Sequence, residues 1–205
     1  IKSLHVRNFR SLVSVQLPLH NLNVVIGPNG SGKTALTEVL QLLQRGSQGE
    51  LGRFFDDRGG YRSVISQNNG HVSAGSLAVQ VELTKSEKSD DQIDTYTLEL
   101  RGTQLGFEVG AESFRTADPT ARSQAAFDYS SSAVSSSEGS KHFLSSVGLA
   151  ELLPTEPLLS QIPAAHQEGL RALPPLKKFL GGVSYHRPID VSERSPVRLP
   201  QSLTP

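Results

Sequence analysis

Eight consecutive residues have the types and spacing needed to bind the phosphates of a nucleotide. They follow the pattern G-x-x-x-x-G-K-[ST] and comprise Gly27, Pro28, Asn29, Gly30, Ser31, Gly32, Lys33 and Thr34. The glycines allow backbone angles and close approaches that a Cβ would block, so successive N–H groups can point into one concavity. We expect Lys33 to reach the β- and γ-phosphates and the Thr34 hydroxyl to ligate Mg²⁺. The chemistry indicated is electrostatic stabilisation of a phosphoryl group during its transfer.

The segments on either side of this loop predict the elements that position it. Residues 22–26 (Leu-Asn-Val-Val-Ile) have the composition of a short buried strand, and residues 35–44 have the spacing of an amphipathic helix. That helix is expected to pack on a sheet through one face, formed by Leu36, Val39, Leu40 and Leu43. Arg45 and Gly46 have the types that end a helix. The N–H groups and dipole of a helix that begins near Lys33 would also attract phosphate.

Alternating apolar and polar residues predict strands before and after the loop. Residues 1–17 have the pattern of two strands with a turn near residues 8–11. Residues 47–75 are rich in Gly, Asn, Asp and Arg, which indicates loop with at most short helical pieces. Residues 76–115 then alternate again in three stretches, which predicts an antiparallel meander. Strand, loop and helix followed by further strands predict an α/β fold.

Two of these segments together resemble a known family. The opening Asn8-Phe9-Arg10-Ser11-Leu12, followed by Val-Val-Ile-Gly-Pro-Asn-Gly-Ser-Gly-Lys-Thr, is similar to the N-terminal part of the RecF/SMC/OLD-like group of ATP-binding-cassette ATPases. The resemblance implies a P-loop NTPase core with an attached antiparallel β-subdomain and a small helical insertion. It implies ATP and Mg²⁺ as cofactors and places Asn8 and Arg10 beside the nucleotide, although both could simply cap the turn. It also suggests Arg58 or Arg62 as a residue near nucleotide or DNA, the alternative being a solvated loop arginine.

Composition divides the chain into three parts. Residues 1–115 are expected to form the ATP-binding lobe with the phosphate loop and the meander. Residues 116–176 are rich in Ser, Ala and Pro and predict a partly helical insertion, with a mobile Ser-rich start and helices at 141–153 and 166–173. Residues 177–205 predict a helix end, a glycine turn, a return strand and an extended end.

Several parts of a hydrolysing cassette ATPase are missing from the sequence. Such an enzyme needs an acidic Mg²⁺ ligand at the end of an apolar strand and a second carboxylate that polarises the attacking water. It also needs a Ser-Gly-Gly signature, supplied by a partner subunit, that faces the γ-phosphate. The run Val79-Gln80-Val81-Glu82 alternates and belongs to the meander, and Leu180-Gly181-Gly182-Val183 lacks the serine and suits a helix-ending turn. The γ-phosphate sensor is unassigned, with Gln67, His186 and Arg187 as candidates. We therefore expect the N-terminal part of a longer ATPase, which stops before the Walker B half.

The composition of the chain limits which partners and which cellular compartment we expect. The 20 basic and 20 acidic residues balance, so the chain lacks the bulk basic charge of a dedicated nucleic-acid binder. No apolar run is long enough to cross a membrane, no cysteine is present, and nucleotide use favours the cytoplasm. The chain has no methionine, so we expect that it lacks its native start. The resemblance implies a homodimer joined through the nucleotide site and DNA as a partner of the complete protein.

Two other functions remain open at this stage. The first is a self-contained small-molecule kinase or GTPase, for which Asp56-Asp57-Arg58-Gly59 offers an Asp-x-x-Gly but no Asn-Lys-x-Asp follows to select guanine. The second is a nucleotide-binding module that does not hydrolyse. Neither H-x-H nor H-E-x-x-H occurs, so the histidines support no metal site beyond Mg²⁺.

Overall fold

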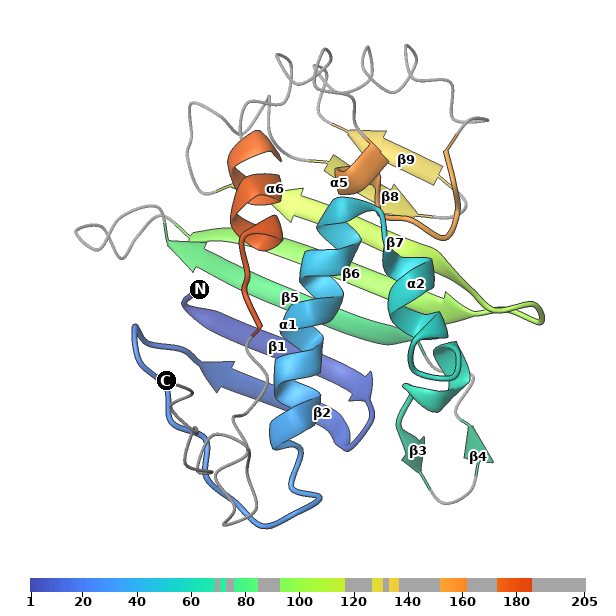
Figure 1. Ribbon diagram of the computed structural model, residues 1–205. Helices are drawn as coiled ribbons and strands as arrows, with labels where there is room; N and C mark the ends of the chain where they lie inside the picture. Colours follow the sequence, from blue (N-terminus) through green and yellow to red (C-terminus); the bar gives the residue numbers. More distant parts are fainter. Residues whose placement is uncertain are drawn as a thin grey trace, which may run out of the picture.

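One antiparallel sheet runs through the computed structural model, which describes residues 1–68, 71–72, 76–84, 93–116, 127–130, 133–136, 152–161 and 173–185 (Figure 1). Its strand order is β2-β1-β5-β6-β7-β8-β9, and every neighbouring pair is antiparallel. The strands are β1 (Ser3–Phe9), β2 (Leu12–Pro18), β5 (Leu77–Thr84), β6 (Ile93–Gly102), β7 (Phe107–Arg115), β8 (Phe127–Ser130) and β9 (Ala133–Ser136). A separate ribbon pairs β3 (Gln67–Asn68) with β4 (His71–Val72).

The predicted hairpin and meander are confirmed, but they form one sheet and not a core with an attached subdomain. Strand β1 pairs with β2 on one side and with β5 on the other. The β1–β5 register places Val6 opposite Val79 and Leu4 opposite Val81, and all four side chains are buried. Such cross-strand pairs of apolar side chains stabilise a sheet. The expectation of a separate β-subdomain is therefore wrong for the described residues.

The segment predicted as a partly helical insertion also contributes strands. Strands β8 and β9 lie within residues 116–176 and extend the sheet beyond β7. The Ser-rich composition concealed them, because polar residues weaken the period-two pattern by which a strand is recognised. The helices predicted at 141–153 and 166–173 fall almost entirely outside the described residues.

Helices cover one face of the sheet, with α1 lying across it and three shorter helices around it (Figure 1). They are α1 (Lys33–Gln48), α2 (Leu51–Asp56), α5 (Leu158–Gln161) and α6 (Leu173–Gly181), with a 3₁₀ turn η1 (Tyr61–Ser63). Together with the strands they enclose a core that includes Phe9, Phe54, Phe55, Tyr96 and Phe114. Among the described residues, no helix combines the length and apolar character that crossing a membrane requires.

Helix α1 forms where predicted, but its buried face and its end differ from the prediction. The residues that it buries are Ala35, Val39, Leu42, Leu43, Gly46 and Ser47, whereas Leu36 and Leu40 are half-buried. Gly46 does not end the helix. It lies inside, where a Cβ would come 3.4 Å from Pro157 Cγ. The helix ends at Gly49, in the left-handed region at φ 76°, and the Gly49 N–H donates to the Gly46 carbonyl.

The buried strand predicted for residues 22–26 is absent. This segment pairs with none of the described strands, and its apolar side chains are exposed, with 82% for Leu22, 74% for Val24, 53% for Val25 and 89% for Ile26. A strand persists only where neighbouring strands satisfy its N–H and C=O groups. The prediction of a buried strand is therefore wrong for these residues, because no described strand lies alongside to pair with them.

The glycine turn after the last described helix is confirmed. Helix α6 ends at Gly181, and the Gly182 N–H donates to the carbonyl of Lys178 at 3.0 Å. The Leu-Gly-Gly-Val run therefore ends a helix and does not begin one, which agrees with its interpretation as a C-terminal turn. Residues 183–185 form no strand, and the predicted continuation after them lies outside the described residues.

Candidate nucleotide-binding site

The phosphate loop connects the exposed segment 22–26 to the N-terminus of α1. Gly30 and Gly32 have φ of 82° and 94°, in the left-handed region that L side chains rarely adopt. Gly32 is the N-cap residue of α1, and its carbonyl accepts the first helical hydrogen bond, from the Leu36 N–H at 2.9 Å. The backbone angles at these two positions thus explain why glycine is favoured there. They turn the chain so that the helix begins at Lys33.

The Lys33 ammonium lies inside the curve of the loop. Its Nζ donates to the carbonyl oxygens of Gly27 and Pro28, each at 2.6 Å. The chain therefore bends back on itself over six residues, with a positive charge at the centre of the bend. This arrangement places the charge beside the first N–H groups of α1, where helix geometry also favours an anion.

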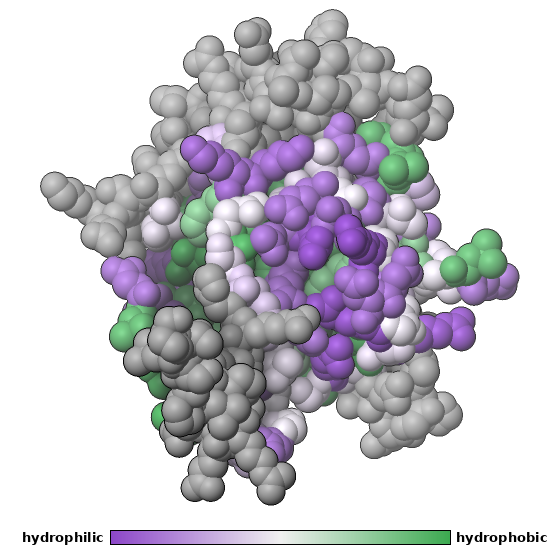
Figure 2. All heavy atoms as spheres, in the orientation of Figure 1, coloured by the Kyte–Doolittle hydropathy of each residue, from purple (hydrophilic) through white to green (hydrophobic). Residues whose placement is uncertain are grey.

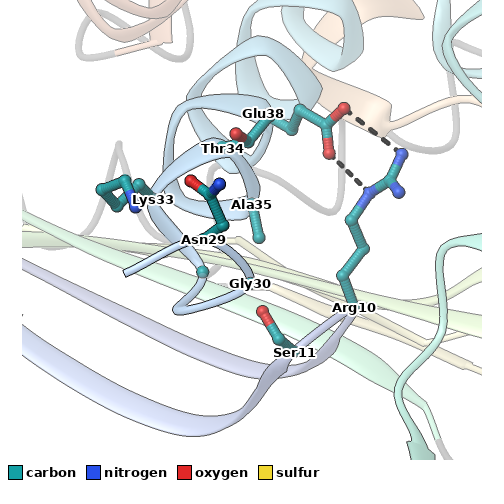
Figure 3. A pocket seen from close by; sticks show the side chains of 9 residues that line it. Arg10, Ser11, Asn29, Gly30, Lys33, Thr34, Ala35 and Glu38 are labelled. Carbon is teal, nitrogen blue, oxygen red and sulfur yellow. Dashed lines mark hydrogen bonds and ion pairs between the residues drawn. The ribbon is translucent and has the colours of Figure 1, made fainter. Parts of the chain in front are cut away.

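A cavity of about 250 Å³ lies between the loop and the β1–β2 turn (Figure 3). Its lining residues are Arg10, Ser11, Asn29, Gly30, Gly32, Lys33, Thr34, Ala35 and Glu38. The loop and the turn fit closely, because a Cβ on Gly32 would come 2.9 Å from Leu12 Cδ2 and 3.1 Å from Ser11 Oγ. Arg10 of the hairpin thus lines the same cavity as Lys33 and Thr34 of the loop.

Two glycine-to-alanine substitutions distinguish the stability cost of backbone strain from the cost of steric contact between the loop and the turn. Gly32→Ala is expected to destabilise the protein by about 2–3 kcal/mol, because it adds contacts with Leu12 and Ser11 to the strain of a left-handed residue. Gly30→Ala has the same strain but no atom within 4 Å of the new Cβ, so about 1 kcal/mol is expected. Urea unfolding of both variants measures the difference. Equal losses would show that the loop does not pack on the turn.

The two residues placed at the site by resemblance differ in position. Arg10 lines the cavity, whereas Asn8 does not line it and donates from Nδ2 to the Ser76 carbonyl at 3.0 Å. Both have positive φ, 58° for Asn8 and 49° for Arg10. The backbone of this turn is held by Val64 and Ser66, since the Arg10 N–H donates to Val64 and the Ser66 N–H donates to the Asn8 carbonyl. A role for Asn8 in nucleotide binding stays a prediction.

Three lining residues were missed by sequence reasoning, namely Ser11, Ala35 and Glu38. Ser11 belongs to the turn that contacts the loop, and Glu38 lies one helical turn after Thr34. A signal for Glu38 was available, because it is the only acidic residue of α1 and follows Thr34 by four positions, which places both on one side of the helix. Its position beside a phosphate site is unexpected for a carboxylate.

The sequence profile of the AAA ATPase domain matches residues 1–137. The chain belongs to this AAA ATPase domain family. Its matched region includes the hairpin, the phosphate loop and the meander. This assignment confirms that the phosphate loop belongs to an ATPase domain.

Relatives of known name match shorter stretches of this AAA ATPase domain. An OLD nuclease of Thermus scotoductus is 44% identical over 43 residues, which is 21% of this chain and 8% of the nuclease. DNA replication and repair protein RecF of Idiomarina loihiensis is 39% identical over 70 residues, and RecF of Shewanella piezotolerans is 45% identical over 88 residues. These cover 34% and 42% of this chain, but only 18% and 21% of the two RecF proteins.

A solved structure shows a more distant likeness. It comes from work on the ATP-driven dimerisation and DNA-stimulated activation of SMC ATPases and covers 57% of this chain and 68% of its own. The sequence identity is 18% and the TM-score is 0.39. At that TM-score the likeness carries no structural inference.

A second, larger cavity adjoins the phosphate loop of this AAA ATPase domain. It measures about 840 Å³ and is lined by Arg10, Thr34, Glu38, Gln41, Gln44, Arg45, Phe54, Asp57, Arg58 and Tyr185. Figure 2 shows hydrophilic side chains gathered over α1 and α2 on this side of the molecule. Arg58 is not a solvated loop arginine, because its side chain is 18% exposed and lines this second cavity between α1 and α2.

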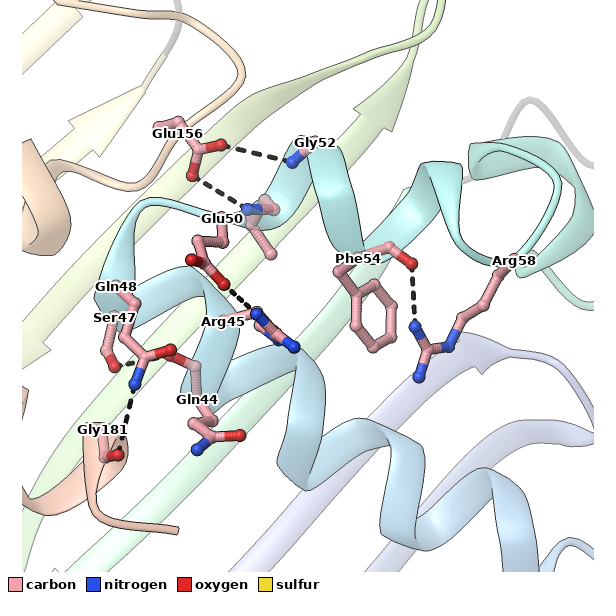
Figure 4. Close-up of polar contacts among 11 residues, drawn as sticks. Gln44, Arg45, Ser47, Gln48, Glu50, Gly52, Phe54, Arg58, Glu156 and Gly181 are labelled. Carbon is pink, nitrogen blue, oxygen red and sulfur yellow. Dashed lines mark hydrogen bonds and ion pairs between the residues drawn. The ribbon is translucent and has the colours of Figure 1, made fainter. Parts of the chain in front are cut away.

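The arginines of this second cavity are held by polar contacts (Figure 4). The Arg58 guanidinium donates from Nη1 to the Phe54 carbonyl at 2.9 Å and from Nη2 to Gln41 Oε1 at 2.7 Å, and it lies 3.8 Å above the Phe54 ring. Arg45 pairs with Glu50 at the other end of α1. The Asp-x-x-Gly that includes Arg58 follows helix α2 and not a strand, so the structure gives a GTPase interpretation no support.

The three residues considered for sensing the γ-phosphate stay predictions. Gln67 lies in the two-residue strand β3, and His186 and Arg187 fall outside the described residues. Within the described part of the chain, no group of three His, Cys, Asp or Glu side chains is close enough to hold a metal ion. An ATPase Mg²⁺ ion needs fewer protein ligands, because substrate phosphates and water provide the others. Thr34, exposed and facing the cavity, suits that role.

Proposed function

We propose that this chain is the ATP-binding, N-terminal part of a RecF/SMC/OLD-like ATPase. The observation that carries the proposal is the loop 27–34, in which two left-handed glycines, a central lysine ammonium and the start of α1 surround a cavity. The proposal includes Mg²⁺-dependent hydrolysis in the complete protein. DNA metabolism or defence against phage is the process we propose for it.

The residues of the loop fit a bound triphosphate. A Cβ at Gly32 would come 2.9 Å from Leu12 Cδ2 and 3.1 Å from Ser11 Oγ, so glycine lets the loop lie against the turn that bears Arg10. Lys33 Nζ is held only by two carbonyl oxygens, which are weaker acceptors than phosphate oxygens, so phosphates would replace them. Thr34 would hold Mg²⁺, which, when bound, neutralises charge on the phosphates. Arg10 would add a second positive charge from the opposite wall of the cavity.

Hydrolysis is proposed to require a further part of the protein. Among the described residues, Glu38 is the only carboxylate that lines the cavity at the phosphate loop, and it is paired with arginines. The apolar segment 22–26 is exposed and unpaired among the described strands. A C-terminal half that adds strands beside this segment would bury it and could supply the acidic Mg²⁺ ligand and the water-activating carboxylate. The small fraction of each curated relative that the chain spans supports this view.

Association is proposed to depend on the same site. ATP bound between two copies would join them, with each copy supplying a signature segment to the other's nucleotide, and hydrolysis would release them. For this chain, dimerisation and DNA binding are both properties of the complete protein in our proposal.

Nucleotide binding and turnover test the proposal in two stages. We expect the 205-residue chain to bind Mg²⁺–ATP in preference to Mg²⁺–GTP in calorimetric titrations, and to hydrolyse ATP only after its native C-terminal continuation is added. Preference for GTP would refute the family-based proposal in favour of a GTPase. Turnover by the chain alone would place a catalytic carboxylate within it. No turnover after extension would favour a binding module.

A further inference from the structure

One carboxylate stands between two arginines at the border of the two cavities. Arg10 Nε lies 2.5 Å from Glu38 Oε2, and Arg10 Nη2 donates to Glu38 Oε1 at 3.2 Å (Figure 3). On the other side, Arg58 Nε lies 3.6 Å from Glu38 Oε1. The Glu38 side chain is 16% exposed. The three residues come from the β1–β2 turn, from α1 and from the turn after α2, so three separate elements meet here.

The two arginines are held differently. Arg58 has three contacts besides Glu38, which are the Phe54 carbonyl, the Phe54 ring and the Gln41 side chain. The Arg10 side chain is 37% exposed, and Glu38 is the only described side chain with which it makes an ion pair or a hydrogen bond. Arg58 is therefore fixed by its surroundings, whereas Arg10 is free to move if another anion replaces Glu38.

The contact between Arg10 and Glu38 is not an ideal one. The buried atoms Arg10 Nε and Glu38 Oε2 are close, but their angles do not make a hydrogen bond. Arg10 also has φ of 49°, a backbone conformation that costs a non-glycine residue free energy. Strain of this kind at the wall of a ligand cavity points to a functional constraint.

Glu38 is also at an unfavourable place for an anion if the cavity accepts phosphates. Its charge opposes that of a triphosphate, and like charges this close repel strongly at a partly buried site. The charge is tolerable because two arginines neutralise it. When one arginine leaves, the other stays, so Glu38 is never left as a lone buried charge, which would be costly.

We propose that Glu38 acts as a latch, which holds Arg10 away from the phosphate loop until nucleotide phosphates compete for that arginine. On binding, Arg10 moves from Glu38 to the phosphates while Arg58 keeps Glu38 neutralised. Glu38 is thus a positioning residue that tunes affinity, and its partner ligand is a polyphosphate such as ATP. The inference rests on the proposed binding of ATP at residues 27–34.

Four variants test the latch in titrations with Mg²⁺–ATP and with inorganic tripolyphosphate, which has three phosphates but no nucleoside. Glu38→Gln is expected to bind both ligands about three- to tenfold more tightly, because Arg10 is no longer held by a charge. Glu50→Gln, which removes the matched carboxylate beside Arg45, is expected to change affinity less than twofold. Arg10→Gln is expected to weaken binding about tenfold. In an Arg10→Gln background, Glu38→Gln is expected to add less than twofold.

Salt dependence and stability provide the readouts that separate a latch from a structural role. Binding by Glu38→Gln is expected to weaken more steeply with salt than wild-type binding. In wild type the contact between Arg10 and the phosphates replaces the Arg10–Glu38 ion pair, which salt also screens, whereas the variant loses no ion pair on binding. Thermal unfolding of each variant identifies any that do not fold, and Glu38→Ala provides a second removal of the charge.

The outcomes distinguish failure of the latch from failure of the proposed function. If wild type binds ATP and Glu38→Gln binds no more tightly than Glu50→Gln, the latch is wrong and the function stands. If Glu38→Gln binds Mg²⁺–ATP more weakly, Glu38 serves the metal site and the latch is also wrong. If the gain persists in the Arg10→Gln background, Arg10 is not the arginine that moves. If neither wild type nor Glu38→Gln binds either ligand, both proposals fail.

Discussion

Replacing Lys33 with Ala is expected to lower the affinity for Mg²⁺–ATP by about 100-fold or more and to leave the fold intact. The ammonium lies within the phosphate loop, where it donates to two carbonyl oxygens at 2.6 Å. Charge-assisted hydrogen bonds to phosphate are each worth about 1.5–3 kcal/mol, and about 1.4 kcal/mol corresponds to tenfold in affinity. Two such bonds lost on truncation account for the expected change. Isothermal titration with ATP and Mg²⁺ measures it.

The structure also explains why stability should hardly change in that variant. Lys33 belongs to an exposed loop and contributes no side chain to the buried core. Lys178→Ala, which removes the same charge from an exposed position on α6, is the matched control and is expected to bind ATP as wild type does. Unchanged affinity of Lys33→Ala, with normal unfolding, would show that residues 27–34 do not bind the phosphates.

Sequence reasoning succeeded where local chemistry decides the structure. The glycines at 30 and 32 must adopt a left-handed backbone, and only residues of that kind do so at low cost. The start of α1 at Lys33 follows from the same turn. The hairpin and the three-stranded meander were visible because apolar and polar residues alternate along them. The alternation is most regular in β6, where every second residue from Asp94 to Leu100 is buried.

It failed where a distant segment decides whether a residue is buried. Residues 22–26 have the composition of a core strand, yet their exposure depends on neighbours that no local pattern reveals. The face of α1 was misplaced because Ala35 and Leu42 face the sheet, while Gly46 faces Pro157 from far along the chain. Glu38 was missed for a similar reason, since the two arginines that pair with it, Arg10 and Arg58, adjoin it only in the folded protein.

A second large effect is expected at Glu112, a fully buried carboxylate that ties α5 to the sheet. Its Oε1 accepts from the Tyr96 hydroxyl at 2.9 Å and from the Leu159 N–H at 3.1 Å, and its Oε2 accepts from the Leu158 N–H at 2.5 Å. Leu158 and Leu159 belong to the core on which α1 also packs. This one side chain therefore joins β6, β7 and α5.

Glu112→Ala is expected to destabilise the protein by roughly 3–6 kcal/mol. The change leaves one hydroxyl and two backbone N–H groups buried without an acceptor, and each such group costs about 1–3 kcal/mol. Because that loss is a large part of a typical domain's stability, the variant is best measured by urea unfolding beside Glu112→Gln, which keeps an acceptor oxygen. A small loss in the Ala variant would mean that α5 is not held through this carboxylate.

The same carboxylate should make stability depend on pH in a defined direction. Burial raises the pKa of Glu112 from 4.5 to about 7, even though the three donors favour the ionised form and lower it. A folded-state pKa above the unfolded value gives stability that is complete below about pH 4.5 and is lost as pH rises through about 7. A shift of this size corresponds to a loss of about 3 kcal/mol in total. Glu112→Gln lacks the ionisation, so its stability relative to wild type is expected to rise by that amount between pH 4.5 and 8.

A matched carboxylate on the neighbouring segment provides the control. Glu156 also accepts two backbone N–H bonds, from Leu51 at 3.1 Å and Gly52 at 3.2 Å (Figure 4), but it is only half-buried. Burial raises the pKa of Glu156 as well, yet solvent screens its charge, so Glu156→Gln is expected to change the pH dependence much less. If the two Gln variants show the same pH profile, or if wild type does not lose stability relative to Glu112→Gln between pH 4.5 and 8, ionisation of Glu112 is not the cause of the pH dependence. If the profiles differ as expected, the ionisation of one buried carboxylate sets how strongly pH affects the joining of β6, β7 and α5.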